Sequence, residues 1–174
     1  YRGSHCSSSI AVKVLPGPEA RMLHEAVMFE MAKAVQGVVM PTVVCFGKLA
    51  STHQRFNFLA TSLVEGTTLS SIEITPSIAA AAAAAVQQLH GCGLVHGDLT
   101  LSNMILVQQQ AELSTGLQQP SPVMLLDLGR AMLATAEECQ KELERLNAKL
   151  AKCVAVTAAT TAQAGVAGAA GMQQ

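Results

Sequence analysis

The feature that most constrains this chain is a polar loop set between two apolar stretches at residues 94–107. A Leu-Val pair leads into His96-Gly-Asp98, an asparagine follows at Asn103, and Met-Ile-Leu-Val comes directly after it. Short apolar runs bounded by turn residues predict two strands joined by a loop. This loop therefore holds a carboxylate and a carboxamide at a fixed separation along the chain.

Two further segments carry charge in or after predicted strands. Ala11-Val-Lys13 lies in an alternating stretch at residues 10–15, and Asp127-Leu-Gly129 follows an apolar stretch that begins at residue 123. Each segment alone is ambiguous, because a strand lysine is usually solvated and an Asp-x-Gly is usually a turn. Their order and spacing relative to the loop at 96–103 make a joint functional interpretation the stronger one.

Together the three segments resemble the motifs of the protein-kinase-like superfamily. Residues 11–13 resemble the V-A-I-K strand, residues 96–103 the H-R-D-x-x-x-x-N catalytic loop, and residues 127–129 the D-F-G motif. The resemblance implies an α+β, protein-kinase-like bilobal fold with an incomplete N-lobe sheet and a minimal helical C-lobe. It also implies ATP and Mg²⁺ as cofactors.

The resemblance assigns catalytic roles to two charged residues. Lys13 would be catalytic and would also bind ATP by holding the non-transferred phosphates. A carboxylate from the predicted helix at 19–35 would pair with it, Glu25 by preference and Glu30 as the second choice. Asp98 would orient the acceptor hydroxyl and accept its proton.

The resemblance also assigns nucleotide and metal contacts. Asn103 and Asp127 would hold the Mg²⁺ ions and so bind the cofactor, because Mg²⁺ prefers oxygen ligands. Thr61 would close the back of the adenine pocket, and Ser62 and Val64 would offer backbone groups to the adenine edge. An ordinary core strand remains the alternative for this stretch.

Within the superfamily, the loop His-Gly-Asp-Leu-Thr-x-Ser-Asn is similar to that of the short atypical kinase of the KEOPS tRNA-modification complex. Gly97 and Thr100 stand where many protein kinases carry Arg and Lys, and His96 is expected to be a buried orienting residue. No Gly-rich phosphate loop precedes Lys13. We therefore expect an N-terminally incomplete fragment with weak nucleotide affinity.

The patterning predicts helices at 19–35, 76–90 and 135–154, and strands at 41–47 and 58–64. The first helix should bury a broad apolar face, which consists of Met22, Leu23, Ala26, Val27, Met31 and Ala34. Thr75 is an N-cap before Pro76, and Thr135 begins a capping box with Glu138. Residues 108–122 are predicted to form a mobile insertion.

We expect four parts: a partial kinase N-lobe at 1–64, a minimal C-lobe with the catalytic loop and metal-binding motif at 65–134, an amphipathic helix at 135–154, and a disordered Ala/Thr/Gln tail at 155–174. The amphipathic helix carries an apolar stripe that can bind a partner helix. The stripe consists of Cys139, Leu143, Leu146 and Leu150.

Composition limits the partners. A net charge of -1 rules out a basic nucleic-acid-binding surface as the default partner mode, and none is evident. The Ala-rich run at 79–86 is far shorter than the ~20 residues that span a bilayer, so no membrane partner is expected. Five cysteines without a C-x-x-C pair favour an intracellular, reducing compartment, cytoplasm or nucleus.

The sequence therefore predicts an ATP-dependent phosphotransferase of the protein kinase type, of Ser/Thr specificity, that transfers the γ-phosphoryl group to a protein hydroxyl on an unknown substrate. Three alternatives stay open. The chain is a catalytically degenerate nucleotide-binding scaffold, a KEOPS-kinase-like ATPase, or a small-molecule kinase. As a fragment it can also be inactive.

Overall fold

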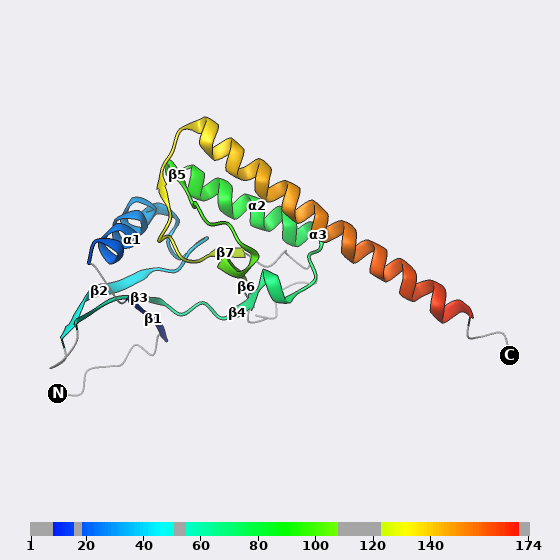
Figure 1. The fold of residues 1–174 in the computed structure, drawn as a ribbon, viewed down its shortest axis with the longest axis horizontal. Helices are drawn as coiled ribbons and strands as arrows, with labels where there is room; N and C mark the ends of the chain where they lie inside the picture. The colour runs from blue at the N-terminus through cyan, green and yellow to red at the C-terminus, as the bar shows by residue number, and fades with distance from the viewer. Residues whose placement is uncertain (1–8, 16–18, 51–54, 108–122, 171–174) are drawn as a thin grey trace, which may run out of the picture.

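The computed structural model describes residues 9–15, 19–50, 55–107 and 123–170 (Figure 1). Small sheets and helices alternate along these residues, and the predicted insertion at 108–122 lies outside them. The fold is therefore α+β, as the sequence predicts. No helix in the described ranges combines the length and the apolar character needed to cross a membrane.

The N-terminal part is an antiparallel sheet covered by one helix. Its strands, in the order β1-β3-β2, are β1 (Ile10–Leu15), β3 (Arg55–Ser62) and β2 (Val43–Ala50). Helix α1 (Glu19–Met31) and the 3₁₀ helix η1 (Lys33–Val35) follow β1, and α1 packs against β2 and β3 (Figure 1). This packing brings one face of α1 toward the strand that carries Lys13.

The buried face of α1 differs in part from the predicted one. Leu23 and Val27 are 41% and 51% exposed, and Met31 is exposed as well. Met22 and Ala26 are buried as predicted, and the helix also buries Met28, Phe29 and the acidic Glu25. The helix is rotated so that Glu25 points inward, where the Lys13 ammonium compensates for burying its charge.

The C-terminal part has two small sheets and two long helices. One sheet has the order β4-β6-β7 and the other pairs β5 with β8. Their bounds are β4 (Gly66–Thr68), β5 (Leu94–Val95), β6 (Met104–Val107), β7 (Val123–Leu125) and β8 (Met132–Leu133). Two short 3₁₀ helices precede α2 and β6, η2 (Leu69–Ser71) and η3 (Leu101–Asn103).

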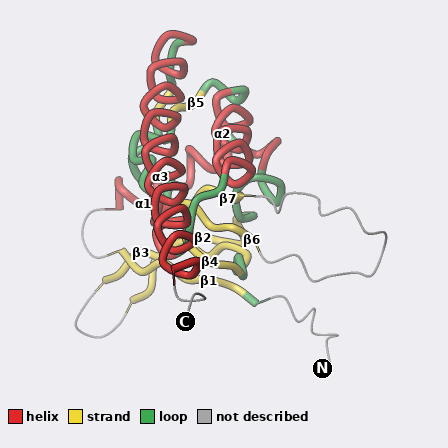
Figure 2. Tube along the Cα trace, turned by 90° about the vertical axis from the view of Figure 1, so that its right-hand side faces the viewer, coloured by secondary structure: helices red, strands yellow, loops and turns green. Residues whose placement is uncertain are grey.

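Helices α2 (Pro76–His90) and α3 (Ala136–Ala170) lie side by side over these strands (Figure 2). Both begin where the sequence predicts. The Thr75 hydroxyl accepts a hydrogen bond from the Ile78 N–H, and Thr135 and Glu138 form the reciprocal bonds of a capping box.

The apolar stripe of α3 contacts the chain's own core. Leu146 and Leu150 are 2% and 1% exposed, and Leu143 packs against the same cluster. Since α2 contacts α3 directly, the helix partner expected for this stripe is α2 of the same chain. A second difference is that α3 continues to Ala170, through the predicted tail, and extends beyond α2 (Figure 1). Alanine is the best helix former, and no proline interrupts this segment.

One apolar core connects the two parts. Phe29 and Leu59 from the N-terminal part belong to the same buried cluster as Leu89 and Leu125 from the C-terminal part. Fully burying such a side chain stabilises the fold by roughly 1.5–3 kcal/mol. The two parts are therefore held together around the residues between them, while the predicted lobe boundary at residue 64 stays a prediction.

Candidate functional site

Lys13 and Glu25 form an ion pair between the first strand and the first helix. The Lys13 Nζ atom lies 3.1 Å from Oε1 and 2.9 Å from Oε2 of Glu25. The Glu25 side chain is only 3% exposed, whereas Lys13 is 37% exposed. Glu30, the second choice from the sequence, pairs with Lys33 on the surface. Lys13 is thus held by its ammonium group, while part of its side chain is exposed to solvent.

Asp127 contacts the same ammonium group. Its Oδ1 atom lies 2.7 Å from Lys13 Nζ and accepts a hydrogen bond from the Gly129 N–H. Asp127 also has a φ of 61°, in the left-handed region that residues with a Cβ rarely adopt. Asp adopts this region more readily than most residues with a Cβ, and backbone conformations of this kind are often found at functional sites.

The three charges shift each other's pKa values. Burial lowers the pKa of Lys13, but the hydrogen bonds and charges of Asp127 and Glu25 outweigh it, so that pKa is raised. Burial dominates at Glu25 and raises its pKa despite the Lys13 ammonium. At Asp127 burial is outweighed by the hydrogen bonds from Lys13 and from the Gly129 N–H, and the pKa is lowered. Asp127 is thus held as a carboxylate.

The loop at residues 96–103 is joined to the Asp127 segment by the ring of His96. His96 is fully buried; its Nε2 atom donates to the Leu126 carbonyl at 2.8 Å, and its Nδ1 atom accepts from the Asp98 N–H at 3.3 Å. Both nitrogens are therefore used inside the protein. This arrangement agrees with the expectation that His96 orients the loop.

Asn103 lies at the other end of the same loop and also holds the loop in place. Its Nδ2 atom donates to the Asp98 carbonyl at 2.9 Å, and its own carbonyl accepts from the Leu126 N–H at 2.8 Å. The amide oxygen of Asn103 is then left as a potential ligand. The Asp98 carboxylate is 39% exposed, and its nearest cation is Arg130, 4.0 Å away.

A cavity of about 210 Å³ lies beside the three charges. Lys13, Glu25 and Asp127 line it together with apolar side chains and with Thr61, the residue expected at the back of an adenine pocket. Asp98 and Asn103 are not part of its lining. They are joined to it through the bonds that the loop makes to Leu126.

The expectation that Ser62 and Val64 offer backbone groups to an adenine edge needs a correction at Ser62. Neither Ser62 nor Val64 lines this cavity. The Ser62 N–H donates to the Thr42 carbonyl at 2.8 Å, and the Ser62 hydroxyl accepts from the Thr42 N–H. Because its N–H is already used between strands, any contact of Ser62 with an adenine edge would come from its carbonyl group.

The residues present fit a hard divalent cation. Asp127 supplies a charged carboxylate, and Asn103 supplies an amide oxygen whose direction is fixed by the bond from its Nδ2 atom. Mg²⁺ usually binds proteins through one or two carboxylates together with substrate phosphates. The donor set is therefore suited to a Mg²⁺ that arrives with a nucleotide.

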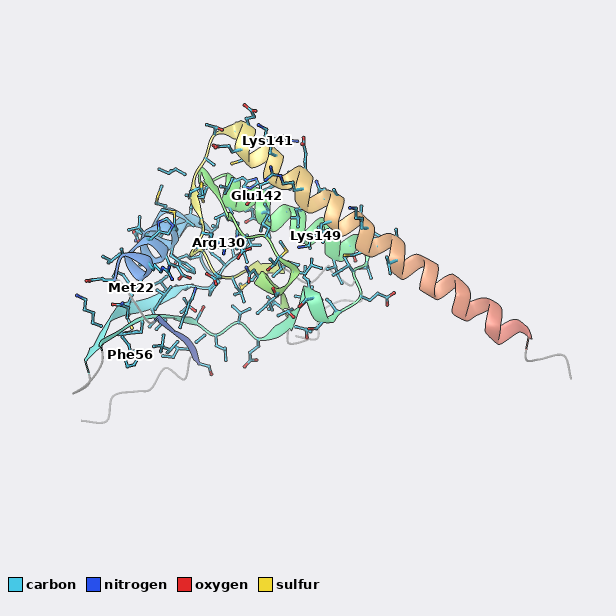
Figure 3. All side chains as sticks on the ribbon, viewed as in Figure 1. Met22, Phe56, Arg130, Lys141, Glu142 and Lys149 are labelled. Carbon is cyan, nitrogen blue, oxygen red and sulfur yellow. The ribbon has the colours of Figure 1, made fainter. Side chains whose placement is uncertain are left out.

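Sequence reasoning missed Glu142, a residue of α3 that accepts hydrogen bonds from the loop at 96–103. Its Oε2 atom accepts from His90 Nε2 at 2.9 Å and from the His96 N–H at 3.0 Å, and its Oε1 atom accepts from the Gly97 N–H at 2.8 Å. Figure 3 shows it on α3. The available signal was its place beside the apolar stripe, since it stands between Cys139 and Leu146 on the inward side of the helix.

The structure also explains why a glycine stands at position 97. Its φ of 75° favours glycine, and an added Cβ would overlap the backbone carbonyl of Arg130. The loop and the segment after Asp127 can approach closely only because this side chain is absent. The segment after Asp127 is held on its other side by His24, whose Nε2 atom bonds to the Ala131 carbonyl at 2.9 Å.

Comparison with known proteins agrees with this geometry. The sequence model of the lipopolysaccharide kinase (Kdo/WaaP) family matches residues 35–164, which is more than half of the chain. The matched range includes the loop at 96–103 and Asp127 but begins after Lys13 and Glu25. A search of the curated proteins finds no match.

Proposed function

The chain belongs to the lipopolysaccharide kinase (Kdo/WaaP) family, within the protein-kinase-like superfamily, and we propose that it transfers the γ-phosphoryl group of Mg-ATP to a hydroxyl group. The observation that carries this proposal is the convergence of Lys13, Glu25 and Asp127 on one cavity. Phosphoryl transfer depends mainly on positioning and charge stabilisation, and these are the functions that such a cluster can supply.

In this proposal Lys13 changes partner when nucleotide binds. Its ammonium group contacts both Glu25 and Asp127, and a triphosphate would compete with Asp127 for it. Glu25 keeps the lysine in place because it is buried and makes contact through both oxygens. The Asp127 carboxylate is then released toward Mg²⁺, which would neutralise charge on the phosphates.

Asp98 is the proposed base for the acceptor hydroxyl. It is one of only two aspartates in the sequence, the other being Asp127. Its carboxylate is partly exposed, while its backbone is held by His96 and Asn103. A base that is accessible at its carboxylate and fixed at its backbone can orient a hydroxyl group without moving itself.

The acceptor is proposed from the family. Its description as a lipopolysaccharide kinase family favours a sugar hydroxyl. The protein hydroxyl that the sequence analysis expected is kept as the competing acceptor, and Ser/Thr specificity depends on it. A sugar and a protein substrate can be distinguished directly by the assay below.

A KEOPS-kinase-like ATPase is the second candidate, and Thr100 favours it. In many protein kinases a lysine at this position contacts the transferring phosphate, whereas the Thr100 hydroxyl here bonds to the Ser102 hydroxyl at 2.9 Å. A site without that lysine has less charge with which to direct the phosphoryl group to an acceptor. Hydrolysis of ATP without acceptor phosphorylation is the outcome that this candidate predicts.

The experiment measures Mg²⁺-dependent ATP turnover by the 174-residue chain and by its Asp98→Ala and Asp127→Ala variants. Glu144→Ala is the control, because Glu144 is an exposed carboxylate on α3 that does not line the cavity beside Lys13. We expect both aspartate variants to lose about 10²–10⁴-fold in rate and the control to be unchanged.

The same assay identifies the acceptor when monosaccharides, a sugar phosphate and casein are supplied with γ-labelled ATP. Label on a sugar supports the proposal, and label on casein supports the protein acceptor. Turnover without any labelled acceptor supports the ATPase. If none of the proteins turns over ATP, the chain is a degenerate scaffold and the proposal is wrong.

A further inference from the structure

A second cavity lies between the catalytic-loop segment and α3. Its volume is about 380 Å³, within the range of small-molecule sites. Gly97 and Leu99, the two neighbours of Asp98 in the sequence, form one wall, and α3 forms the other. No residue lines both this cavity and the one beside Lys13. It is therefore separate from the cavity beside Lys13.

Three cations from α3 line this cavity. Lys141, Arg145 and Lys149 follow each other at intervals of four residues, which places them on one face of the helix. Figure 3 shows Lys141 and Lys149 along α3. Like charges at this spacing repel each other weakly, and an anion bound against the row would relieve that repulsion.

The two carboxylates in the same lining bond to partners other than these three cations. Glu142 accepts hydrogen bonds from two loop N–H groups and from His90, and Glu138 is used in the capping box of α3. Lys141 is paired with Glu137 outside the cavity lining, at 2.6 Å. Among the described residues, the cations of this lining that have no carboxylate partner are therefore Arg145 and Lys149.

Arg145 and Lys149 are poorly paired. Among the described residues Arg145 has no carboxylate within ion-pair distance, and Lys149 makes only a 3.5 Å contact with the Leu99 carbonyl. Both side chains are exposed, and Leu99 and Leu146 supply an apolar wall beside them. A guanidinium group and an ammonium group beside an apolar wall are suited to an anionic group attached to a ring.

We propose that this cavity binds the phosphate group of a phosphorylated sugar, the acceptor of the reaction, through Arg145 and Lys149. The assignment as an acceptor site rests on the proposed function, because it places the sugar against the loop that carries Asp98. The cavity holds the acceptor by a group that does not react. Binding energy from such a group positions the reacting hydroxyl.

The test is a titration of the ¹⁵N-labelled chain, followed by the amide signals of Gly97, Leu99 and the α3 residues. The probes are glucose 6-phosphate, inorganic phosphate and glucose. The variant is the double change Arg145→Ala/Lys149→Ala. The control is Lys152→Ala, which removes an exposed cation from the same helix outside the cavity lining.

We expect glucose 6-phosphate to shift these signals, to bind more tightly than inorganic phosphate, and to bind about tenfold more weakly to the double variant. Lys152→Ala should bind as the unmodified chain does, and glucose should cause no shift. Equal affinity in the double variant and the control would overturn the site. Equal affinity for glucose 6-phosphate and inorganic phosphate would overturn the sugar assignment.

ATP turnover, measured separately, distinguishes the two proposals. Turnover with no binding at these amides overturns the cavity assignment and leaves the proposed function intact. Binding at these amides in a chain without turnover overturns the acceptor role, because the proposed function has then failed.

Discussion

The Nζ atom of Lys13 lies 2.9 Å from Oε2 of Glu25 and thereby connects the first strand to the first helix. The same ammonium group also contacts Asp127, 114 residues further along the chain. One side chain thus joins the N-terminal sheet, α1 and the segment after β7. The geometry of the whole site depends on this contact.

Lys13→Met tests the contact directly. We expect ATP turnover to fall about a hundredfold, because the phosphates lose their positioning cation. The free energy of unfolding should fall by only about 1–2 kcal/mol, since Lys13 is partly exposed and solvent screens the loss. Adding Glu25→Gln should restore stability but not turnover, as measured by urea unfolding and a turnover assay. Recovery of turnover in the double variant would contradict the role of Lys13.

The stability of Lys13→Met should depend on pH in a defined direction. Burial raises the pKa of Glu25 above 4.5, and the Lys13 ammonium counters part of this effect. Without Lys13 that pKa rises further. A raised acid pKa means that the folded state binds the proton more readily, so the variant should gain stability relative to the unmodified chain as the pH falls from 7 toward 4.5. Urea midpoints at several pH values check this, and a gap that widens on acidification would contradict it.

Glu142→Gln tests the support of the loop. One accepting oxygen is replaced by an amide NH₂, so the N–H of His96 or Gly97 loses its partner, at a cost of about 1–3 kcal/mol. We expect turnover to fall about tenfold or more while ATP affinity is kept, because Lys13 and Asp127 are untouched. Faster hydrogen exchange at the Gly97 amide would report the loosened loop. Glu144→Gln, on the exposed side of α3, is the control.

Substitutions at two glycines distinguish the energetic cost of a left-handed backbone from the cost of a steric overlap. Gly93 and Gly97 have φ values of 74° and 75°, but only at Gly97 would a Cβ meet another atom, the Arg130 carbonyl. Gly93→Ala should therefore cost about 1–2 kcal/mol, from the left-handed backbone alone. Gly97→Ala should cost more and should also reduce turnover. Equal unfolding free energies for the two variants would argue against the close contact.

Features governed by local chemistry could be predicted from the sequence. The N-cap at Thr75 and the capping box at Thr135 need only neighbouring residues, and both are present. The choice of Glu25 over Glu30 came from the motif resemblance, which carries information about distant pairing that periodicity alone lacks.

Features governed by tertiary contacts could not be predicted in this way. Leu23 and Val27 looked like core residues, but the burial of Glu25 against Lys13 fixes a different face of α1. Glu142 acts on a loop 46 residues away; its place beside the apolar stripe indicates an inward position but not which segment it contacts. Similarly, the N–H of Ser62 is used by a neighbouring strand, and local patterning does not reveal it.

The most direct test of the account is the affinity for ATP, measured by calorimetry with and without Mg²⁺, in the unmodified chain and in Asp127→Asn. If Lys13, Asn103 and Asp127 surround one metal-bound triphosphate, Mg²⁺ strengthens ATP binding in the unmodified chain, and the variant loses that dependence while its fold is kept. The same Mg²⁺ dependence in both proteins would contradict the account.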